Sequence, residues 1–367
     1  MRSNFFNAGR VIAINVLVLF VLANIAYWAI PVVTVARNTF WSTAEVDDPR
    51  MNLPNYVDSP WAKQHFREFA ALTMKHMSYI GWRRKEFTGQ TITVGGRYLQ
   101  RRTVNNRNDK DATAYFFGGS TMWGTGAPDD QTIPSQFNAI TGIHAENFGE
   151  SAYVARQNLV MLIQLLEDGK RPNLVFFYDG ANDVIAKCRR DATPASYYRE
   201  AELVASLERS KIKDQSFAYF LRPLFSVAAD IRQKLTTDSA RPFPIYDCHE
   251  SPKKSAAIAE GLIRDWTIAQ QLVEAYGGQF IAALQPVAYF SSTRKGHIYL
   301  SKELEAQYDA VYPLIKQRLM RHKHFYDLTD ALDVDEFVYI DFCHVSPNGN
   351  RRIASRLAAI AKNRIER

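Results

Sequence analysis

The sequence predicts an α/β fold built on a doubly wound parallel sheet. From residue 111 onward, short apolar runs alternate with longer segments of helical apolar spacing, and this alternation is typical of βαβ units. Ligands of open parallel sheets bind beyond the carboxyl ends of the strands. In this chain, the segments 118–124, 147–150 and 179–183 place polar residues or glycines at the ends of predicted strands, and a fourth segment, 341–344, lies between the last predicted strand and the last predicted helix.

The strands are marked by short apolar runs that end in glycine, proline or polar residues. We predict strands over 112–117, 145–148, 174–178, 280–284 and 325–328. The segments between and after them have helical apolar spacing. We predict helices over 133–140, 154–166, 256–276, 304–320 and 347–361.

Two regions fall outside this alternation. Residues 58–110 are predicted to form an N-terminal extension, with a helix over 58–80 followed by a hairpin of two short strands within 86–99. Residues 184–255 are predicted to be an insertion within a catalytic domain at 111–367, of the kind that often forms a lid or substrate wall.

The chain begins with a long apolar segment. Residues 11–30 contain no charged side chain, and about 20 helical residues span a bilayer core. We therefore expect a transmembrane helix over 11–30, with 1–10 cytoplasmic and 31–57 a tether. The remainder would lie outside the cytoplasm, in a periplasmic space if the source is bacterial. A signal peptide with a long apolar region is the alternative.

Composition gives no indication of nucleic-acid binding. The formal charge is +7, but Lys and Arg are spread along the chain, whereas a nucleic-acid footprint is usually a basic cluster. The three cysteines do not have zinc-site spacing, and we expect no metal. In an oxidising compartment we favour a bridge between Cys188 and Cys248 that leaves Cys343 free. Three reduced cysteines remain the alternative.

Ser120 and the pair Asp341 and His344 have the side chains needed for acyl transfer. A serine hydroxyl is a weak nucleophile that needs an adjacent base. The three-residue spacing lets the carboxylate of Asp341 orient the imidazole of His344. Ser120 could instead cap a helix, and an Asp-x-x-His pair can be a simple surface hydrogen bond.

An oxyanion hole requires two or three hydrogen-bond donors aimed at one point. The backbone N–H groups of Ser120 and Gly149 and the side-chain amide of Asn182 suit this role. Gly149 and the segment around Asn182 could equally be ordinary turns. Gln285, directly after the fourth predicted strand, could line the pocket.

In this order, Ser120, Gly149, Asn182 and the Asp341–His344 pair resemble the blocks of the SGNH (GDSL-like) hydrolase superfamily. The resemblance implies a flavodoxin-like sheet of about five parallel strands. It also implies ester hydrolysis or acyl transfer without a metal or organic cofactor. The chain differs from the family at Gly119, where an aspartate usually precedes the serine.

The resemblance and the apolar N-terminus together suggest the substrate. A membrane-anchored relative outside the cytoplasm is similar to enzymes that add or remove O-acetyl groups on envelope polysaccharides. We therefore expect the membrane, an ester-bearing glycan or lipid, and polysaccharide assembly proteins as partners, and no nucleic acid. The alternatives are a non-catalytic glycan-binding or assembly subunit and a lipid-directed lysophospholipase or thioesterase.

Overall fold

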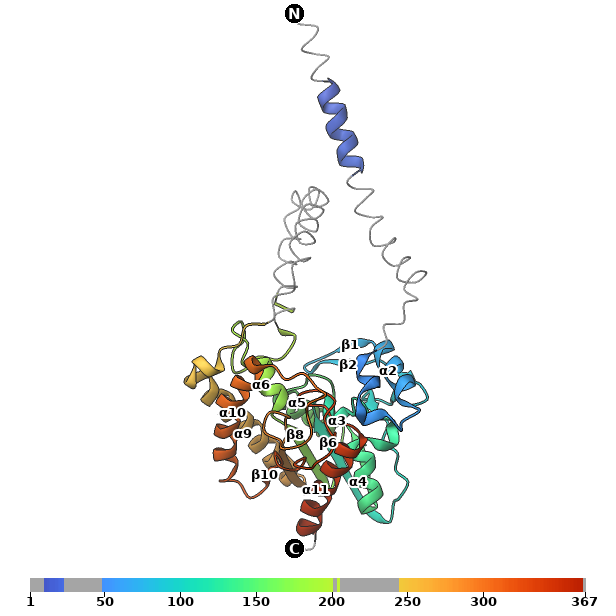
Figure 1. The fold of residues 1–367 in the computed structure, drawn as a ribbon, viewed down its shortest axis with the longest axis vertical. Coiled ribbons are helices and arrows are strands. Elements are labelled where there is room, and N and C mark those ends of the chain that lie inside the picture. The colour runs from blue at the N-terminus through green and yellow to red at the C-terminus, as the bar shows by residue number, and fades with distance from the viewer. Residues whose placement is uncertain (1–9, 23–47, 201–202, 205–243, 366–367) are drawn as a thin grey trace, which may run out of the picture. The chain divides into compact units, whose positions relative to one another are not determined.

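The computed structural model describes residues 10–22, 48–200, 203–204 and 244–365 (Figure 1). The larger of its two compact units comprises Asp47–Glu200 and Ile245–Arg367. Its main sheet has eight strands in the order β10-β9-β8-β6-β7-β5-β4-β3. Five of them are parallel: β6 (Lys110–Gly118), β7 (Ile143–Asn147), β8 (Leu174–Asp179), β9 (Gln279–Leu284) and β10 (Phe325–Asp327).

The parallel strands have the order 2-1-3-4-5 when they are numbered along the chain. This is the flavodoxin-like order, in which ligands bind where the sheet changes its direction of growth. Here that switch point lies at β6, because β7 pairs with one of its edges and β8 with the other. The predicted α/β fold with a parallel central sheet is therefore confirmed, and the switch point lies beside the residue that follows β6.

Helices cover both faces of the sheet (Figure 1). Side chains of successive strand residues alternate between the faces, so the odd and even residues of β6 enter different cores. Phe117 packs in one core with α5 (Ala155–Glu167), α9 (Pro252–Ala275) and α10 (Lys302–Leu319). Phe116 packs in the other with α4 (Ile133–Thr141) and α11 (Pro347–Ile365).

Three antiparallel strands of the N-terminal extension lengthen the same sheet. They are β3 (Phe87–Thr88), β4 (Thr93–Gly95) and β5 (Gln100–Arg101). The predicted hairpin around Gly95-Gly96 corresponds to the β4–β5 pair, and β3 adds a strand that was not expected. Arg101 of β5 pairs with Asn147 of β7. The extension is thus joined to the parallel sheet by backbone hydrogen bonding.

The predicted helix over 58–80 is wrong in its second half. The helix α2 covers only Ala62–Ala71, and β1 (Met74–Met77) follows and pairs with β2 (Gly81–Arg84). The turn between these strands contains Tyr79 at φ 64° and Gly81 at φ 106°. A right-handed helix cannot continue through left-handed residues, and the resulting hairpin buries Trp82 against Tyr153.

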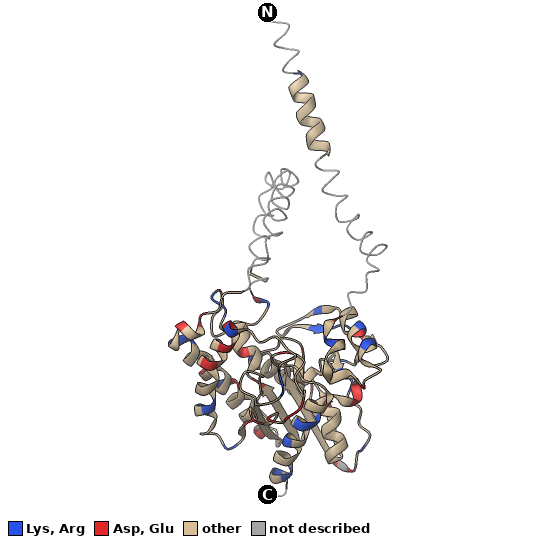
Figure 2. Ribbon diagram, viewed as in Figure 1, with Lys and Arg blue, Asp and Glu red and all other residues tan. Residues whose placement is uncertain are grey.

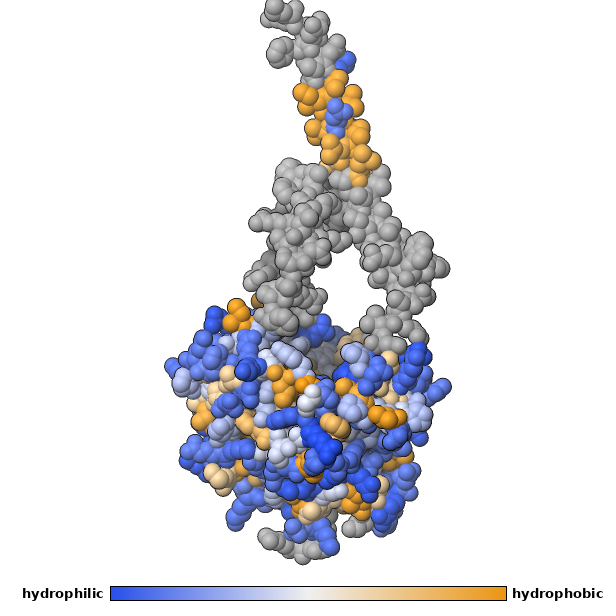
Figure 3. Space-filling model, viewed as in Figure 1, coloured by the Kyte–Doolittle hydropathy of each residue, from blue (hydrophilic) through white to orange (hydrophobic). Residues whose placement is uncertain are grey.

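The smaller unit contains a helix over 10–22, which overlaps the first part of the membrane span predicted at 11–30. Its described side chains are mostly apolar and exposed (Figure 3). Within the described part of the chain, no helix reaches the length and hydropathy needed to cross a bilayer. The rest of the span, most of the tether, and residues 201–202 and 205–243 of the predicted insertion lie outside the described residues.

Positive and negative residues are intermixed on the elements of the larger unit (Figure 2). Some of these charges stabilise the extension internally. The buried carboxylate of Glu68 on α2 accepts the backbone N–H groups of residues 90, 91 and 92 at 2.6, 2.9 and 3.0 Å. Burial raises its pKa, but the hydrogen bonds from Gln64, Thr91 and Gln90 outweigh this effect and lower the pKa of Glu68 to about 2.

We expect Glu68→Gln to destabilise the protein by about 2–3 kcal/mol at neutral pH. A depressed carboxyl pKa contributes stability above the unfolded-state pKa of roughly 4.3. That contribution is lost as the pH falls toward the folded-state value of about 2. Urea unfolding between pH 7 and pH 3 should therefore show a steeper loss of stability in the wild type than in Glu68→Gln. The exposed Glu86 provides the matched control, because Glu86→Gln should have the same stability as the wild type at every pH.

Candidate active site

The sheet topology brings the predicted site segments to one edge. Ser120 begins the short helix α3 (Ser120–Trp123) directly after β6, and Asn182 lies in α6 (Ala181–Lys187) directly after β8. The ends of these two strands are in register, with Gly118 paired to Tyr178. Ser120 and Asn182 therefore leave the sheet at the same edge, at the switch point.

Asp341 and His344 lie on a closed loop before α11. An antiparallel bridge joins Tyr339 to Val345, and the N–H of Ile340 donates to the carbonyl of His344 at 2.9 Å. The intervening residues must therefore turn back on themselves. This loop places the carboxylate and the imidazole beside Ser120, which is 224 residues away in sequence.

Ser120, His344 and Asp341 form a continuous chain of hydrogen bonds. The Oγ of Ser120 lies 2.6 Å from Nε2 of His344, and Nδ1 of His344 lies 2.6 Å from Oδ2 of Asp341. In the tautomer that suits catalysis, Nδ1–H donates to the carboxylate and Nε2 accepts the serine proton. The arrangement can therefore remove a proton from Ser120 as its oxygen attacks a carbonyl carbon.

The surroundings of Asp341 keep it ionised. Its other oxygen, Oδ1, accepts the backbone N–H groups of Cys343 at 3.0 Å and His344 at 2.8 Å. Burial raises its pKa, but the charge of His344 and these hydrogen bonds outweigh burial and hold the pKa of Asp341 well below its usual range. The side chain of His344 is 16% exposed, so the imidazole remains accessible from the surface.

Gly119 and Asn182 fit together beside the nucleophile. A Cβ built on Gly119 would lie 2.3 Å from Nδ2 of Asn182. This amide donates one hydrogen bond to the carbonyl of Tyr153 at 2.9 Å, and its second N–H is available for a substrate oxygen. The side-chain amide of Asn182 thus occupies the space that a larger residue at position 119 would need.

We expect Gly119→Ala to reduce kcat/KM for an activated ester by about 10²-fold, because the added methyl group would displace the amide of Asn182, which the sequence predicts to be an oxyanion donor. Thermal unfolding should show that the protein still folds. Gly95→Ala provides the matched control, since a Cβ at Gly95 would meet no atom within 4 Å. If Gly119→Ala kept wild-type activity, Asn182 would not be needed in its present position.

Gly149 is not placed as the sequence predicted. Its N–H donates to Oδ1 of Asn147 at 3.0 Å, and the residue is buried. A Cβ at this position would lie 2.6 Å from the backbone nitrogen of Trp123. Gly149 is therefore required for close packing of the loop, and its N–H already has an acceptor within the protein.

Ala152 offers an N–H in its place. It has a positive φ of 62° in the turn in which the N–H of Tyr153 donates to the carbonyl of Glu150 at 3.3 Å. Among the hydrogen bonds of the described residues, none uses the N–H of Ala152. The same turn carries the Tyr153 carbonyl that holds Asn182. No sequence signal marks Ala152, because left-handed backbone at alanine depends on tertiary contacts.

The N-terminal extension anchors this turn. The guanidinium of Arg84 forms a buried ion pair with the carboxylate of Glu150, whose Oε1 also accepts the N–H of Ser151 at 2.7 Å. The indole of Trp82 donates to the carbonyl of Ser151 at 3.1 Å. Residues of β2 therefore fix both the acidic side chain and the backbone of the turn.

Gln285 is not a pocket residue in this structure. It is 3% exposed, and its amide donates to Oγ1 of Thr121 at 2.9 Å and to the carbonyl of Cys343 at 3.2 Å. It thereby connects the helix that carries Ser120 with the loop that carries His344. Its sequence position after β9 correctly indicated proximity to the site, but burial directs its side chain beneath the surface.

The two aspartates flanking Asn182 form a buried network. Asp183 forms an ion pair of 2.5 Å with Lys187, and both side chains are at most 2% exposed. Asp179 accepts hydrogen bonds from Asn158 and Trp266 at 2.6 and 2.9 Å. Burial and the neighbouring Asp183 raise the pKa of Asp179 well above its usual range. Asp183 therefore links α6 to the start of α5, where it accepts the N–H of Ala155 at 3.3 Å, and Asp179 links the end of β8 to α5 and α9.

The residues present do not favour a metal at this site. Asp341, Cys343 and His344 are the one group of potential ligands found among the described residues, with ligand atoms within 4.8 Å of one another. Metals bind the thiolate form of cysteine. Here burial and the nearby Asp341 carboxylate raise the pKa of the Cys343 thiol. The imidazole and the carboxylate are also engaged with each other.

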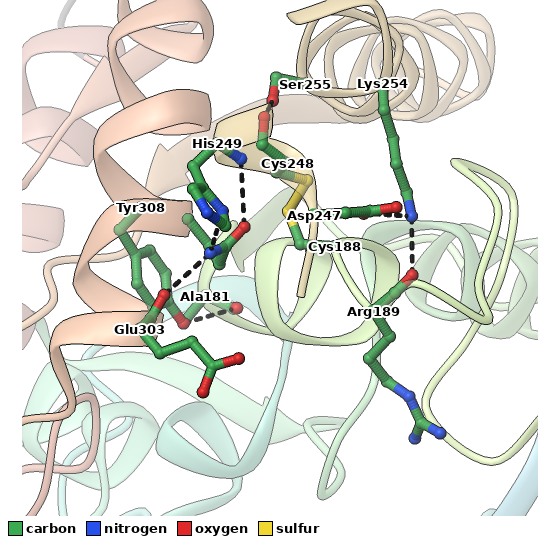
Figure 4. Close-up of a disulfide and its surroundings, with 11 residues drawn as sticks. Ala181, Cys188, Arg189, Asp247, Cys248, His249, Lys254, Ser255, Glu303 and Tyr308 are labelled. Carbon is green, nitrogen blue, oxygen red and sulfur yellow. Dashed lines mark hydrogen bonds and ion pairs between the residues drawn. A yellow bond between two sulfur atoms is a disulfide. The ribbon is translucent and has the colours of Figure 1, made fainter. Parts of the chain in front are cut away.

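A disulfide joins Cys188 to Cys248 (Figure 4). Cys343 is free and buried. The disulfide ties the end of α6 to the segment before α9. Nearby, Nζ of Lys254 contacts the carboxylate of Asp247 at 2.7 Å and the carbonyl of Arg189 at 2.7 Å. The two ends of the predicted insertion are therefore held together close to α6.

A groove of about 470 Å³ lies elsewhere, at the junction of β4, β5 and β7. Its lining residues include Gln100, Asn105, His144 and Glu146. None of the side chains of the hydrogen-bonded chain at Ser120 contributes to it. The groove is therefore separate from the candidate active site.

The chain is similar in fold to several solved structures at low sequence identity. No protein family model matches the chain, and no curated protein matches it. Similar solved structures include a member of the lipolytic G-D-S-L family from Veillonella parvula, which is 12% identical with a TM-score of 0.39 and covers 68% of this chain and 97% of its own. Another is Est24, a carbohydrate acetylesterase from Sinorhizobium meliloti, which is 14% identical with a TM-score of 0.37 and covers 69% of this chain and 99% of its own.

Similarity at these TM-scores does not support any statement about activity. The structure itself establishes the α/β architecture and the mostly parallel sheet. What the site can do must be inferred from its own geometry.

Proposed function

We propose that this protein is a serine-dependent esterase or O-acyltransferase of the SGNH type. The observation that supports this proposal is the chain from Ser120 Oγ through His344 to Asp341, with both linking distances at 2.6 Å. A glycan-binding subunit would have no need for a base hydrogen-bonded to a serine at the switch point of the sheet. A positioned general base typically contributes about 10²–10⁴-fold in rate.

The reaction begins when Ser120 Oγ attacks the ester carbonyl and His344 Nε2 takes the hydroxyl proton. The negative charge that develops on the carbonyl oxygen is stabilised by the Asn182 amide and by the backbone N–H groups of Ser120 and Ala152. The bond to the alcohol then breaks, and His344 returns the proton to the leaving oxygen. The product of this half-reaction is an acyl group on Ser120.

The second half-reaction transfers the acyl group to an acceptor. His344 removes a proton from water or from a sugar hydroxyl, whose oxygen attacks the acyl-enzyme and releases Ser120 with its proton restored. Water gives hydrolysis, and a sugar gives transfer. Asp341 remains ionised in both steps and stabilises the imidazolium.

We infer that the chain is anchored in a membrane by its apolar N-terminal segment, with the catalytic unit outside the cytoplasm. The Cys188–Cys248 disulfide supports an oxidising compartment. We further propose an O-acetylated envelope or extracellular polysaccharide as substrate, with polysaccharide assembly proteins as partners. This substrate class follows from the proposed location and from the resemblance of the motifs.

The proposal is tested by labelling purified full-length protein with a fluorophosphonate probe and mapping the adduct by mass spectrometry. An adduct on Ser120 is the expected result. Absence of any serine adduct, combined with retained binding of polysaccharide, would instead identify a binding subunit. Products from O-acetylated polysaccharide and from an acyl-lipid, compared side by side, decide between a glycan and a lipid substrate.

A further inference from the structure

Residues 48–56, which we call the N-terminal strap, lie directly against the loop that carries His344. The side-chain amide of Asn55 donates to the carbonyl of Phe337 at 2.6 Å and to the carbonyl of Tyr339 at 3.2 Å. Tyr339 forms the bridge that closes the catalytic loop. The strap therefore holds the base of this loop through its backbone.

The strap also contacts the segment that follows Ser120. The buried hydroxyl of Tyr56 donates to the carbonyl of Gly126 at 2.8 Å, and its ring packs in one cluster with Ile340. Both sides of the candidate site thus rest on the same short stretch of chain. The prediction that 31–57 is only a tether is therefore wrong for its last residues, because 48–56 forms two short 3-10 helices packed on the catalytic unit.

Arg50 of the strap reaches the charged end of the triad. Its Nη1 lies 3.8 Å from Oδ2 of Asp341. The same Oδ2 atom is the one that pairs with Nδ1 of His344 at 2.6 Å. One carboxylate oxygen is therefore shared between a permanent cation and the imidazole.

The guanidinium of Arg50 is fixed in this position. Its Nε and Nη2 donate to the carboxylate of Asp48 at 3.0 and 2.7 Å. Its centre lies 5.2 Å from the ring centroid of Phe66 and 5.4 Å from that of Phe69. Such a pre-oriented guanidinium acts on Asp341 without a further loss of side-chain freedom.

We propose that Arg50 is a positioning residue that sets the charge balance of the Asp341–His344 pair, so that the N-terminal strap tunes the active site. This inference rests on the proposed function. The positive charge of Arg50 partly offsets the carboxylate that stabilises the imidazolium. Arg50 therefore favours the neutral imidazole, which is the form that accepts the proton of Ser120.

Within the described part of the chain, four titratable groups other than His344 interact with Asp341: Asp48, Arg50, Tyr56 and Cys343. Burial raises the pKa of the Cys343 thiol and of the Tyr56 hydroxyl, so neither is charged near neutral pH. Burial also raises the pKa of Asp48, but its hydrogen bonds with Arg50 outweigh this effect and lower it. Asp48 and Arg50 are therefore the charged groups of the strap that act on the pair, and they have opposite signs.

The test measures kcat/KM against pH for the full-length protein with an activated ester. In Arg50→Gln, the midpoint of the acidic limb should rise by about half a pH unit, because the imidazolium loses a repelling charge. In Asp48→Asn, the midpoint should fall, because Arg50 is left without its partner. Arg50→Lys should keep a midpoint close to that of the wild type.

Arg97→Gln is the matched control, since Arg97 pairs with Asp168 at the surface and its side chain is 71% exposed. It should not change the profile. A purely structural role for the strap predicts that Arg50→Gln and Asp48→Asn alter the profile in the same way. Unchanged midpoints in both variants, or shifts in the same direction, would overturn the proposal.

A second readout separates this inference from the proposed function. NMR titration of the His344 ring, assigned by comparison with His344→Gln, reports imidazole protonation without any turnover. If the wild type neither hydrolyses esters nor forms a serine adduct, the esterase proposal fails. The ring titration would still show the opposite shifts in Arg50→Gln and Asp48→Asn if Arg50 acts as proposed, and equal midpoints would refute that action.

Discussion

Ser120→Ala is expected to lower kcat for an activated ester by about 10⁶-fold, which is the scale of losing a complete nucleophile–base unit. The physical reason is that, among the described residues, Nε2 of His344 has one hydroxyl partner, Ser120 Oγ at 2.6 Å. The remaining rate should come from the oxyanion donors and from substrate binding alone. The measurement is single-turnover and steady-state kinetics on the purified full-length protein.

The same variant should leave stability almost unchanged. The Ser120 side chain is not fully buried, and its described hydrogen bond is the one to His344. His344→Ala should cause a loss of similar size, and the double variant should lose little more, because residues that act as one unit are not additive. Ser355→Ala, at an exposed helix position, is the control. Full activity in Ser120→Ala would remove the serine mechanism.

Lys187→Met is expected to destabilise the protein by about 3–5 kcal/mol, since it removes one partner of a buried ion pair. Lys187 and Asp183 are 2% and 0% exposed and lie 2.5 Å apart. Without the ammonium, the Asp183 carboxylate would be buried beside Asp179 with no positive partner. Burial and the charge of Asp183 already raise the pKa of Asp179. Urea-induced unfolding, followed by circular dichroism, measures the loss.

The double variant Asp183→Asn with Lys187→Met separates charge from packing. It removes the uncompensated carboxylate, so it should recover most of the stability lost in Lys187→Met. If the double variant were as unstable as Lys187→Met alone, the loss would come from packing of α6 and not from the buried charge. Because α6 begins at the residue before Asn182, weakening it should also lower activity.

Local sequence patterns predicted most of the architecture. The five parallel strands and the helices between them agree with the apolar spacing to within a few residues, because periods of 2 and 3.6 report which face of each element is buried. The helix predicted over 58–80 is wrong from Met74 onward, because apolar spacing that is compatible with a helix there belongs to a hairpin. There the positive φ angles of Tyr79 and Gly81 end any helical path.

The order of the elements and the residues suited to acyl-transfer chemistry, Ser120, Asn182, Asp341 and His344, could be predicted from the sequence. The availability of N–H groups could not, since Gly149 donates to Asn147 and Ala152 does not have an acceptor among the described residues. The tertiary structure also decided that Gln285 is a buried brace and that Arg50 lies on Asp341. Periodicity reports only which face of an element is buried, whereas hydrogen-bond partners and nearby charges depend on how the folded segments, many of them distant in sequence, pack together.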